Sequence, residues 1–246
     1  MDAPYLDSRL SVIEIVGPPG SGKSTLAREL AARLRESSSA VWLSKELQTA
    51  RKGTQAQLTA GARSLVDVVR LWPFFYRSYS GETLLSQVRW TTLLRRVLRH
   101  GYARRLADER RLPQGLLILE PGWQMQLLNG YLFSRKPLSV SEATQFLKAI
   151  PPSDWTICLL VQADIAIARL ERRCRGLPQR MQQLHESQWQ EVIERGNRTT
   201  HILASQGKVL GRAVLEFDVS RMTSEGVRRK VQNFLLADTG ESDRFD

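Results

Sequence analysis

A complete phosphate-binding loop of the pattern G-x-x-x-x-G-K-[ST] occupies residues 17–24, which read Gly-Pro-Pro-Gly-Ser-Gly-Lys-Ser. The apolar, β-rich run 10–16 comes directly before it, and residues 25–34 carry apolar side chains at helical spacing directly after it. Such a loop needs a strand before it and a helix after it, because the helix N-terminus and the loop N–H groups hold the phosphate together. The sequence therefore predicts a strand, a loop and a helix that bind a nucleoside triphosphate.

The fixed positions of the loop have separate chemical roles. Glycines let the backbone wrap closely around phosphate oxygens, so that successive N–H groups point at the anion. Lys23 is predicted to reach the β- and γ-phosphates of ATP, and the Ser24 hydroxyl is predicted to bind Mg²⁺. The predicted nucleotide-contacting residues are Gly17, Pro18, Pro19, Gly20, Ser21, Gly22, Lys23, Ser24 and Thr25.

The chain is strongly basic, with a formal net charge of +11. This charge favours anionic partners, whether nucleotides, phosphorylated substrates, nucleic acid or an acidic membrane surface, and does not choose among them. Much of the excess lies in arginines at 89–111, within a helix predicted over 82–111, where a solvated helix face is a simpler explanation than a binding surface. The scattered cysteines and histidines lack the spacing of a zinc site.

The length and hydrophobic content fit one domain. The chain has 246 residues, 42% of them hydrophobic, and we expect a single domain over 1–236 followed by a disordered acidic tail over 237–246. No secretion signal stands at the start and no apolar run is long enough to span a bilayer, so a cytoplasmic location is expected. The sequence does not indicate an oligomeric state.

A continuous apolar run over 115–119 is closed by Glu120. A buried parallel strand of this kind delivers its last side chain to the edge of the sheet where ligands bind. Glu120 is therefore a candidate for the chemistry. A shorter strand predicted over 40–43 has Lys45 and Glu46 at its exit, which lie near a ligand if that strand is central and in a surface turn otherwise.

An arginine-rich segment follows the strand predicted over 155–161. A helix over 163–176 would place Arg169 and Arg173 on one side, and a loop that carries Arg180 comes next. Clustered guanidinium groups suit phosphoryl transfer, because planar donors can meet the charge that spreads over the transferring oxygens. An exposed arginine-rich helix is the alternative.

The remaining stretches alternate between helical and strand-like patterns. A helix over 55–70 leads into the aromatic residues 71–79, where Pro73 is expected to interrupt it, and these aromatics with Arg77 line a pocket or pack a helix junction. Further expected elements are helices near 124–132, 141–149 and 182–205, a strand over 209–217 closed by Asp218, and a last helix to 236 capped by Thr223 or Ser224.

This alternation predicts an α/β fold with a parallel sheet between two helix layers. The chain contains no Asn/Thr-Lys-x-Asp tetrapeptide, which a regulatory GTPase would carry, and no Ser-Gly-Gly signature of an ABC ATPase. Both absences favour a small kinase.

In the order and spacing of these features, the chain resembles the nucleoside and nucleotide kinases of the P-loop group, particularly thymidylate-kinase-like proteins. The resemblance covers nearly the whole chain and rests on residues 17–24, the strand ending at Glu120, the segment 164–180 and the strand ending at Asp218. It implies a three-layer α/β/α P-loop NTPase fold with five parallel strands and a helical, arginine-bearing lid over about 169–181.

The resemblance also implies roles for individual residues. Lys23 and Ser24 would hold ATP and Mg²⁺, and Glu120 would be a general base or an anchor for a metal-bound water. The implied lid arginines are Arg169, Arg173 and Arg175. These kinases usually have an arginine directly after the acid, whereas this chain has Pro121-Gly122 and so diverges at the acceptor site.

The expected function is ATP- and Mg²⁺-dependent transfer of the γ-phosphoryl group to an unidentified anionic or polar small molecule. The alternative is a nucleotide-dependent regulatory or polyanion-binding protein without small-molecule kinase activity.

Overall fold

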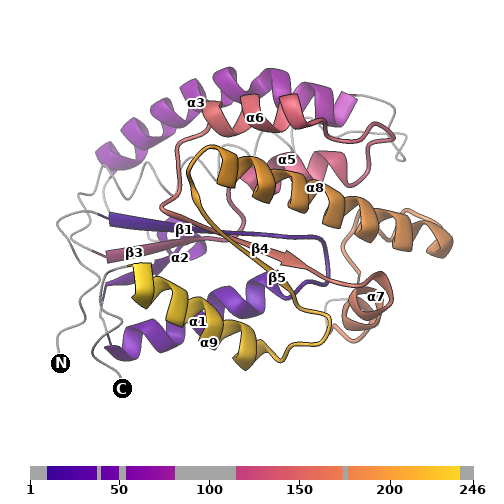
Figure 1. Cartoon of the computed structure of the whole chain (residues 1–246). Coiled ribbons are helices and arrows are strands. Elements are labelled where there is room, and N and C mark those ends of the chain that lie inside the picture. Colours follow the sequence, from indigo (N-terminus) through magenta and orange to yellow (C-terminus); the bar gives the residue numbers. More distant parts are fainter. Residues whose placement is uncertain (1–9, 38–39, 50–53, 81–114, 174–176, 239–246) are drawn as a thin grey trace.

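A computed structural model of the chain describes residues 10–37, 40–49, 54–80, 115–173 and 177–238. Five strands form one sheet in the order β2-β3-β1-β4-β5, and every neighbouring pair is parallel (Figure 1). Their bounds are β1 Leu10–Val16, β2 Val41–Leu43, β3 Gly115–Leu119, β4 Trp155–Leu160 and β5 Ala213–Asp218. The predicted α/β fold with a five-stranded parallel sheet is confirmed.

Helices cover both faces of this sheet. Their bounds are α1 Lys23–Ser37, α2 Ser44–Thr49, α3 Thr54–Ser80, α5 Trp123–Tyr131, α6 Val140–Ala149, α7 Ala163–Glu171, α8 Trp189–Val209 and α9 Ser224–Asp238, with a 3₁₀ turn η1 at Glu186–Gln188. α1 and α9 lie on one face, whereas α3, α5, α6 and α8 form the layer on the other (Figure 1). Within the described ranges, no helix is long and apolar enough to cross a membrane.

The strand order fixes which loops start side by side. β1 lies between β3 and β4, with Glu14 opposite Leu119 of β3 and Val16 opposite Cys158 of β4. The phosphate-binding loop follows β1 and Glu120 follows β3, so both leave the carboxyl edge of the sheet from adjacent strands. In open parallel sheets this edge is where ligands bind.

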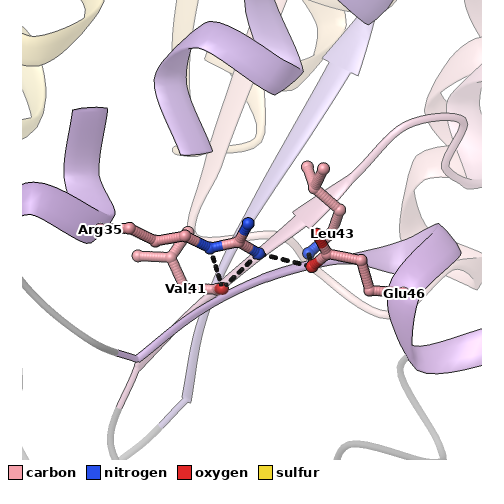
Figure 2. Close-up of polar contacts among 4 residues, drawn as sticks. All are labelled: Arg35, Val41, Leu43 and Glu46. Atoms are coloured by element: carbon pink, nitrogen blue, oxygen red, sulfur yellow. Dashed lines mark hydrogen bonds and ion pairs between the residues drawn. The ribbon is translucent and has the colours of Figure 1, made fainter. Parts of the chain in front are cut away.

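β2 is an edge strand, and side chains satisfy its outer backbone groups. Arg35 donates to the Val41 carbonyl oxygen from Nε at 3.0 Å and from Nη2 at 2.8 Å, and it pairs with the Glu46 carboxylate (Figure 2). The same carboxylate accepts a hydrogen bond from the Leu43 N–H at 2.9 Å. Such coverage protects a sheet edge against pairing with another strand. Glu46 therefore has a structural role at the edge.

The prediction that Pro73 interrupts its helix is wrong. α3 continues through Pro73 to Ser80. A proline inside a helix removes one backbone hydrogen bond, to the carbonyl four residues earlier. Pro73 is exposed, and Val69, whose carbonyl loses that partner, is 73% exposed. Water can replace the missing donor on this face, so the helix continues.

The polar helix predicted over 182–205 is displaced towards the C-terminus. Residues 182–185 form a turn, in which Gln182 Nε2 donates to the Leu177 carbonyl at 2.7 Å, and α8 begins only at Trp189. α8 then runs to Val209, which was predicted to start a strand. Gly211, at φ +71°, ends this helical segment and lets β5 begin at Ala213.

Other predicted boundaries differ more modestly. α7 ends at Glu171, before the predicted end at 176, and α9 includes Ala237 and Asp238, which were predicted to be disordered. Thr223 caps α9, since its hydroxyl accepts from the Gly226 N–H at 3.1 Å. Three predictions lie outside the described residues: the helix over 82–111 with its arginines at 89–111, the lid arginine Arg175, and the tail residues 239–246.

β1 carries a charged side chain into the core. Glu14 is only 2% exposed. Burial raises the pKa of its carboxyl group to about 7, although hydrogen bonds from Gln124 and the positive charge of Arg212 favour the ionised form. At neutral pH, the fold therefore includes an acid that is only partly ionised.

We predict that Glu14 makes stability fall as pH rises. Its pKa in the fold is above the value of 4.5 for an exposed glutamate, so its favourable contribution is complete below about pH 4.5 and is lost by about pH 7. The shift corresponds to about 3 kcal/mol. Urea unfolding at pH 5 to 8 should show the free energy of unfolding of Glu14→Gln rising relative to wild type by about this amount. Parallel curves for the two proteins would contradict the prediction.

Candidate functional site

The phosphate-binding loop joins β1 to α1 and depends on glycine at its turn. Gly20 has φ +81°, and a Cβ atom there would lie 2.6 Å from the Ala166 carbonyl oxygen of α7. The Gly22 carbonyl accepts from the Thr25 N–H at 3.0 Å and the Leu26 N–H at 2.9 Å, which starts α1. The first N–H groups of a helix have no partner within it. The loop and α1 together therefore provide donors for an anion.

The Lys23 ammonium group folds back over this loop. Its Nζ donates to the Pro18 carbonyl at 2.7 Å and to Ser21 Oγ at 3.3 Å. Burial lowers the pKa of Lys23 to about 8, Glu120 opposes this shift, and Arg173 adds to it. The ammonium group is thus held over the loop by the Pro18 carbonyl and the Ser21 hydroxyl.

Glu120 connects three elements at the carboxyl edge of the sheet. Its Oε1 accepts from the Ser24 hydroxyl of α1 at 2.9 Å, and its Oε2 lies 3.1 Å from Lys45 Nζ of α2. Its backbone carbonyl accepts from the Ser44 hydroxyl at 3.3 Å. The structure therefore brings together Ser24 and Glu120, which lie 96 residues apart in the sequence. A hydroxyl and a carboxylate oxygen are ligand types that suit Mg²⁺.

A cavity of about 440 Å³ opens beside the loop. Its walls include Gly20, Ser21, Gly22 and Thr25 of the loop and α1, and Arg169 and Arg173 of the arginine-rich segment. They also include Val219, Met222 and Thr223 from the connection between β5 and α9, and Ser224, the first residue of α9. Arg169 Nη2 donates to the Val219 carbonyl at 2.9 Å, which links α7 to that connection. Two of the three predicted lid arginines thus share one cavity with the loop.

The connection 219–223 and Ser224 of α9 were not predicted as part of the site. The sequence signal was present, because the connection directly follows a predicted strand end at Asp218 and precedes a capped helix. Asp218 itself is exposed. The Ser220 hydroxyl and N–H both donate to its carboxylate and hold its pKa below the ordinary value. Asp218 therefore shapes the turn that forms this wall.

The aromatic-rich segment 71–79 has side chains in two environments, the core and the surface. Leu71, Phe75 and Tyr79 are buried in the core, whereas Tyr76 is 53% exposed and Arg77 is exposed. The packing interpretation therefore holds for the buried members of this group.

Arg180 lies beside Tyr79, over two aromatic rings. Its guanidinium carbon is 3.9 Å from the centre of the Phe133 ring and 5.4 Å from that of Tyr79. Its Nη1 donates to the Asn129 carbonyl of α5 at 2.9 Å. Arg180 thereby fixes the turn after the arginine-rich segment against α5.

Comparisons with known proteins agree with this geometry. The profile of the family described as AAA domain (dynein-related subfamily) matches residues 13–69, which include the phosphate-binding loop. No curated protein matches the chain.

Among solved structures, thymidylate kinase from Candida albicans superposes with a TM-score of 0.53 at 14% identity, over 96% of this chain and 95% of that chain. An uncharacterized protein from Eubacterium ventriosum has a TM-score of 0.42 at 8% identity, over 93% of this chain and 99% of that chain. The chain therefore shares its fold with thymidylate kinase, and its phosphate-binding loop lies within the segment that matches the AAA domain model.

Proposed function

We propose that the chain is an ATP- and Mg²⁺-dependent phosphotransferase that moves the γ-phosphoryl group of ATP to a small polar or anionic molecule. The observation that carries this proposal is the 2.9 Å hydrogen bond between Ser24 of the phosphate-binding loop and Glu120. This bond places the loop that we expect to bind ATP, the phosphoryl donor, beside Glu120, the candidate catalytic acid. The neighbouring cavity of about 440 Å³ offers space for a nucleotide against the loop.

In this proposal each part of the site has one task. Backbone N–H groups of the loop and Lys23 bind the phosphates, and Arg169 and Arg173, together with Arg175, neutralise charge on the transferring group. Ser24 and Glu120 supply oxygen atoms to Mg²⁺ or its waters. The ion, when bound, neutralises charge on the β- and γ-phosphates.

Glu120 is the candidate general base for the acceptor hydroxyl. Its side chain is 11% exposed and lies between Ser24 and Lys45. A carboxylate in this position can accept a proton from an acceptor brought into line with the γ-phosphate. Positioning and charge neutralisation would supply most of the rate enhancement.

The acceptor side supports a polar or anionic substrate. Pro121-Gly122 replaces the arginine expected after the acid, and the Lys45 ammonium group, 64% exposed, lies beside Glu120 instead. Lys45 belongs to α2, so its ammonium group would approach an acceptor from a different direction than an arginine directly after Glu120. We therefore propose an acceptor other than the usual nucleotide of thymidylate-kinase-like proteins.

The decisive experiment measures ADP formation from ATP and Mg²⁺ with nucleosides, nucleotides, sugars and polar metabolites added one at a time. A phosphotransferase forms ADP and a phosphorylated product only with a suitable acceptor. Equal ADP formation with and without every acceptor, together with salt-sensitive binding to polyanions, would instead favour the regulatory or polyanion-binding alternative.

Removal of the Lys23 charge should abolish turnover and leave the fold intact. Lys23→Ala should weaken ATP binding by about tenfold to a hundredfold, because the ammonium group makes charge-assisted hydrogen bonds to phosphate. Arg33→Ala is a matched control, because it removes one positive charge from an exposed position of the same helix. Calorimetric titration with ATP and acceptor-dependent ADP formation measure both effects. Full turnover in Lys23→Ala would exclude this mechanism.

ATP affinity should decrease above pH 8. Lys23 has a pKa lowered to about 8, so the free protein carries its charge below that pH and loses it above. Bound phosphate stabilises the charged form, so binding above pH 8 takes up a proton and weakens by up to about tenfold per pH unit. Titrations from pH 7 to 9.5 should show this slope in wild type and a nearly flat profile in Lys23→Arg. A flat wild-type profile would contradict the prediction.

Glu120→Gln should separate catalysis from binding. The amide keeps the size of the side chain but cannot accept the acceptor's proton, so kcat should fall by about a hundredfold or more. ATP affinity without Mg²⁺ should change less than about threefold, because the phosphate-binding loop remains intact. Single-turnover kinetics with the identified acceptor measures the rate. An unchanged rate would remove Glu120 from the chemistry.

A further inference from the structure

α5 begins directly after the turn that carries Glu120, and its own sequence does not cap it. The N-cap residue is Gly122, which has no side chain to accept from the first turn. Helix N-termini leave backbone N–H groups unpaired, and buried ones need an acceptor. Trp123 and Gln124, the first two residues of α5, are both buried. The cap of this helix must therefore come from elsewhere in the chain.

Glu14 supplies that cap from the middle of β1. Its Oε1 accepts from the Gln124 backbone N–H at 2.7 Å, and its Oε2 accepts from Gln124 Nε2 at 3.2 Å. Gln124 Nε2 also donates to Thr156 Oγ1 of β4 at 3.2 Å. A carboxylate at a helix N-terminus is favoured by the helix dipole as well as by these bonds. β1 and α5 are thus tied together by one buried side chain.

The turn itself packs against the same carboxylate. A Cβ atom on Gly122 would lie 2.3 Å from Glu14 Oε1, so only glycine leaves room for the acid. Gly122 stands two residues after Glu120 in the sequence. Glu14 therefore contacts both the turn that follows Glu120 and the helix that continues from it.

Glu14 provides this cap at a cost in free energy. Burial of a carboxylate is unfavourable, and its hydrogen bonds to Gln124 offset only part of that cost. Arg212, directly before β5, attracts Glu14, but its Nη2 donates to the Leu147 carbonyl. The acid is kept at a cost to stability, at a point where it fixes the backbone that carries the candidate catalytic carboxylate.

We infer that Glu14 is a positioning residue that holds Glu120 against Ser24 by capping α5 from β1. Glu14 lies in the same strand that leads into the phosphate-binding loop, so one strand would set the positions of both halves of the site. Only the last step, that Glu120 and Ser24 assist Mg²⁺-bound nucleotide, rests on the proposed function. The capping role stands on the contacts alone.

The first test measures amide hydrogen exchange in the peptide over residues 120–125. Glu14→Leu should speed exchange there by about tenfold, because a lost N-cap exposes the first turn of α5. Glu14→Gln should keep near-wild-type protection, since its carbonyl oxygen can still accept from the Gln124 N–H and the Gln124 amide can rotate to meet the new group. Thr156→Val is the matched control, because it removes another partner of Gln124 without removing the cap.

A second variant keeps this test decisive if Glu14→Leu does not fold. Gly122→Ala would push the Glu14 carboxylate away from the turn and should speed exchange in the same peptide. Wild-type protection in whichever of the two variants folds would overturn the inference.

The second test measures how Mg²⁺ changes ATP affinity. Wild type should bind ATP more tightly with Mg²⁺ than with EDTA, and Glu14→Leu should lose most of that gain while its affinity in EDTA stays within about twofold. Fast exchange in Glu14→Leu together with a full Mg²⁺ gain would overturn the link to Glu120. No Mg²⁺ gain in wild type would instead contradict the metal role of Ser24 and Glu120, and the exchange result would still decide the role of Glu14.

Discussion

The parallel pairing of β1 with β3 is the constraint on which the rest of the candidate site depends. It places Glu14 opposite Leu119, so that the phosphate-binding loop and Glu120 leave the sheet from the same edge. A shift of one residue in this register would turn every side chain of β1 to the opposite face. In the observed register, the Ser24 hydroxyl lies 2.9 Å from Glu120 Oε1. The apolar burial that fixes the sheet therefore also fixes the positions of Ser24 and Glu120 at its edge.

Buried polar side chains between the sheet and α5 depart from the apolar packing that would be most stable there. Glu14, Gln124 and Thr156 form a hydrogen-bonded chain between β1, α5 and β4. In the described part of the chain, the fully buried Gln126 side chain has no hydrogen-bond partner at either amide atom. An apolar core would avoid both costs. Proteins tend to keep such departures near functional sites, and these lie in the helix that begins after Glu120.

The sequence was sufficient for the parts of the fold that local patterns determine. The loop, the five strands and Glu120 at a strand end could be predicted, because continuous apolar runs and glycine spacing are local signals. Pro73 and the start of α8 could not, because water at an exposed carbonyl and a turn over 182–185 depend on tertiary surroundings. The pairing of Lys45 with Glu120 and the capping by Glu14 join residues far apart in the chain. The charge of Glu14 inside the apolar run 10–16 was the available signal for this residue. Its partner Gln124 could not be predicted from the sequence.

The electrostatics of the candidate site favour a bound anion near Lys23 and Arg173. Burial and the positive charge of Arg173 both lower the pKa of Lys23, whereas Glu120 raises it. Lys23 and Arg173 therefore repel each other, and Glu120 provides negative charge nearby. A triphosphate between the loop and the arginine-rich segment would add several negative charges among these cations and reverse that opposition. Binding of an anion would relieve the repulsion between the like charges that the folded protein holds together. This electrostatic arrangement favours phosphate over a neutral ligand.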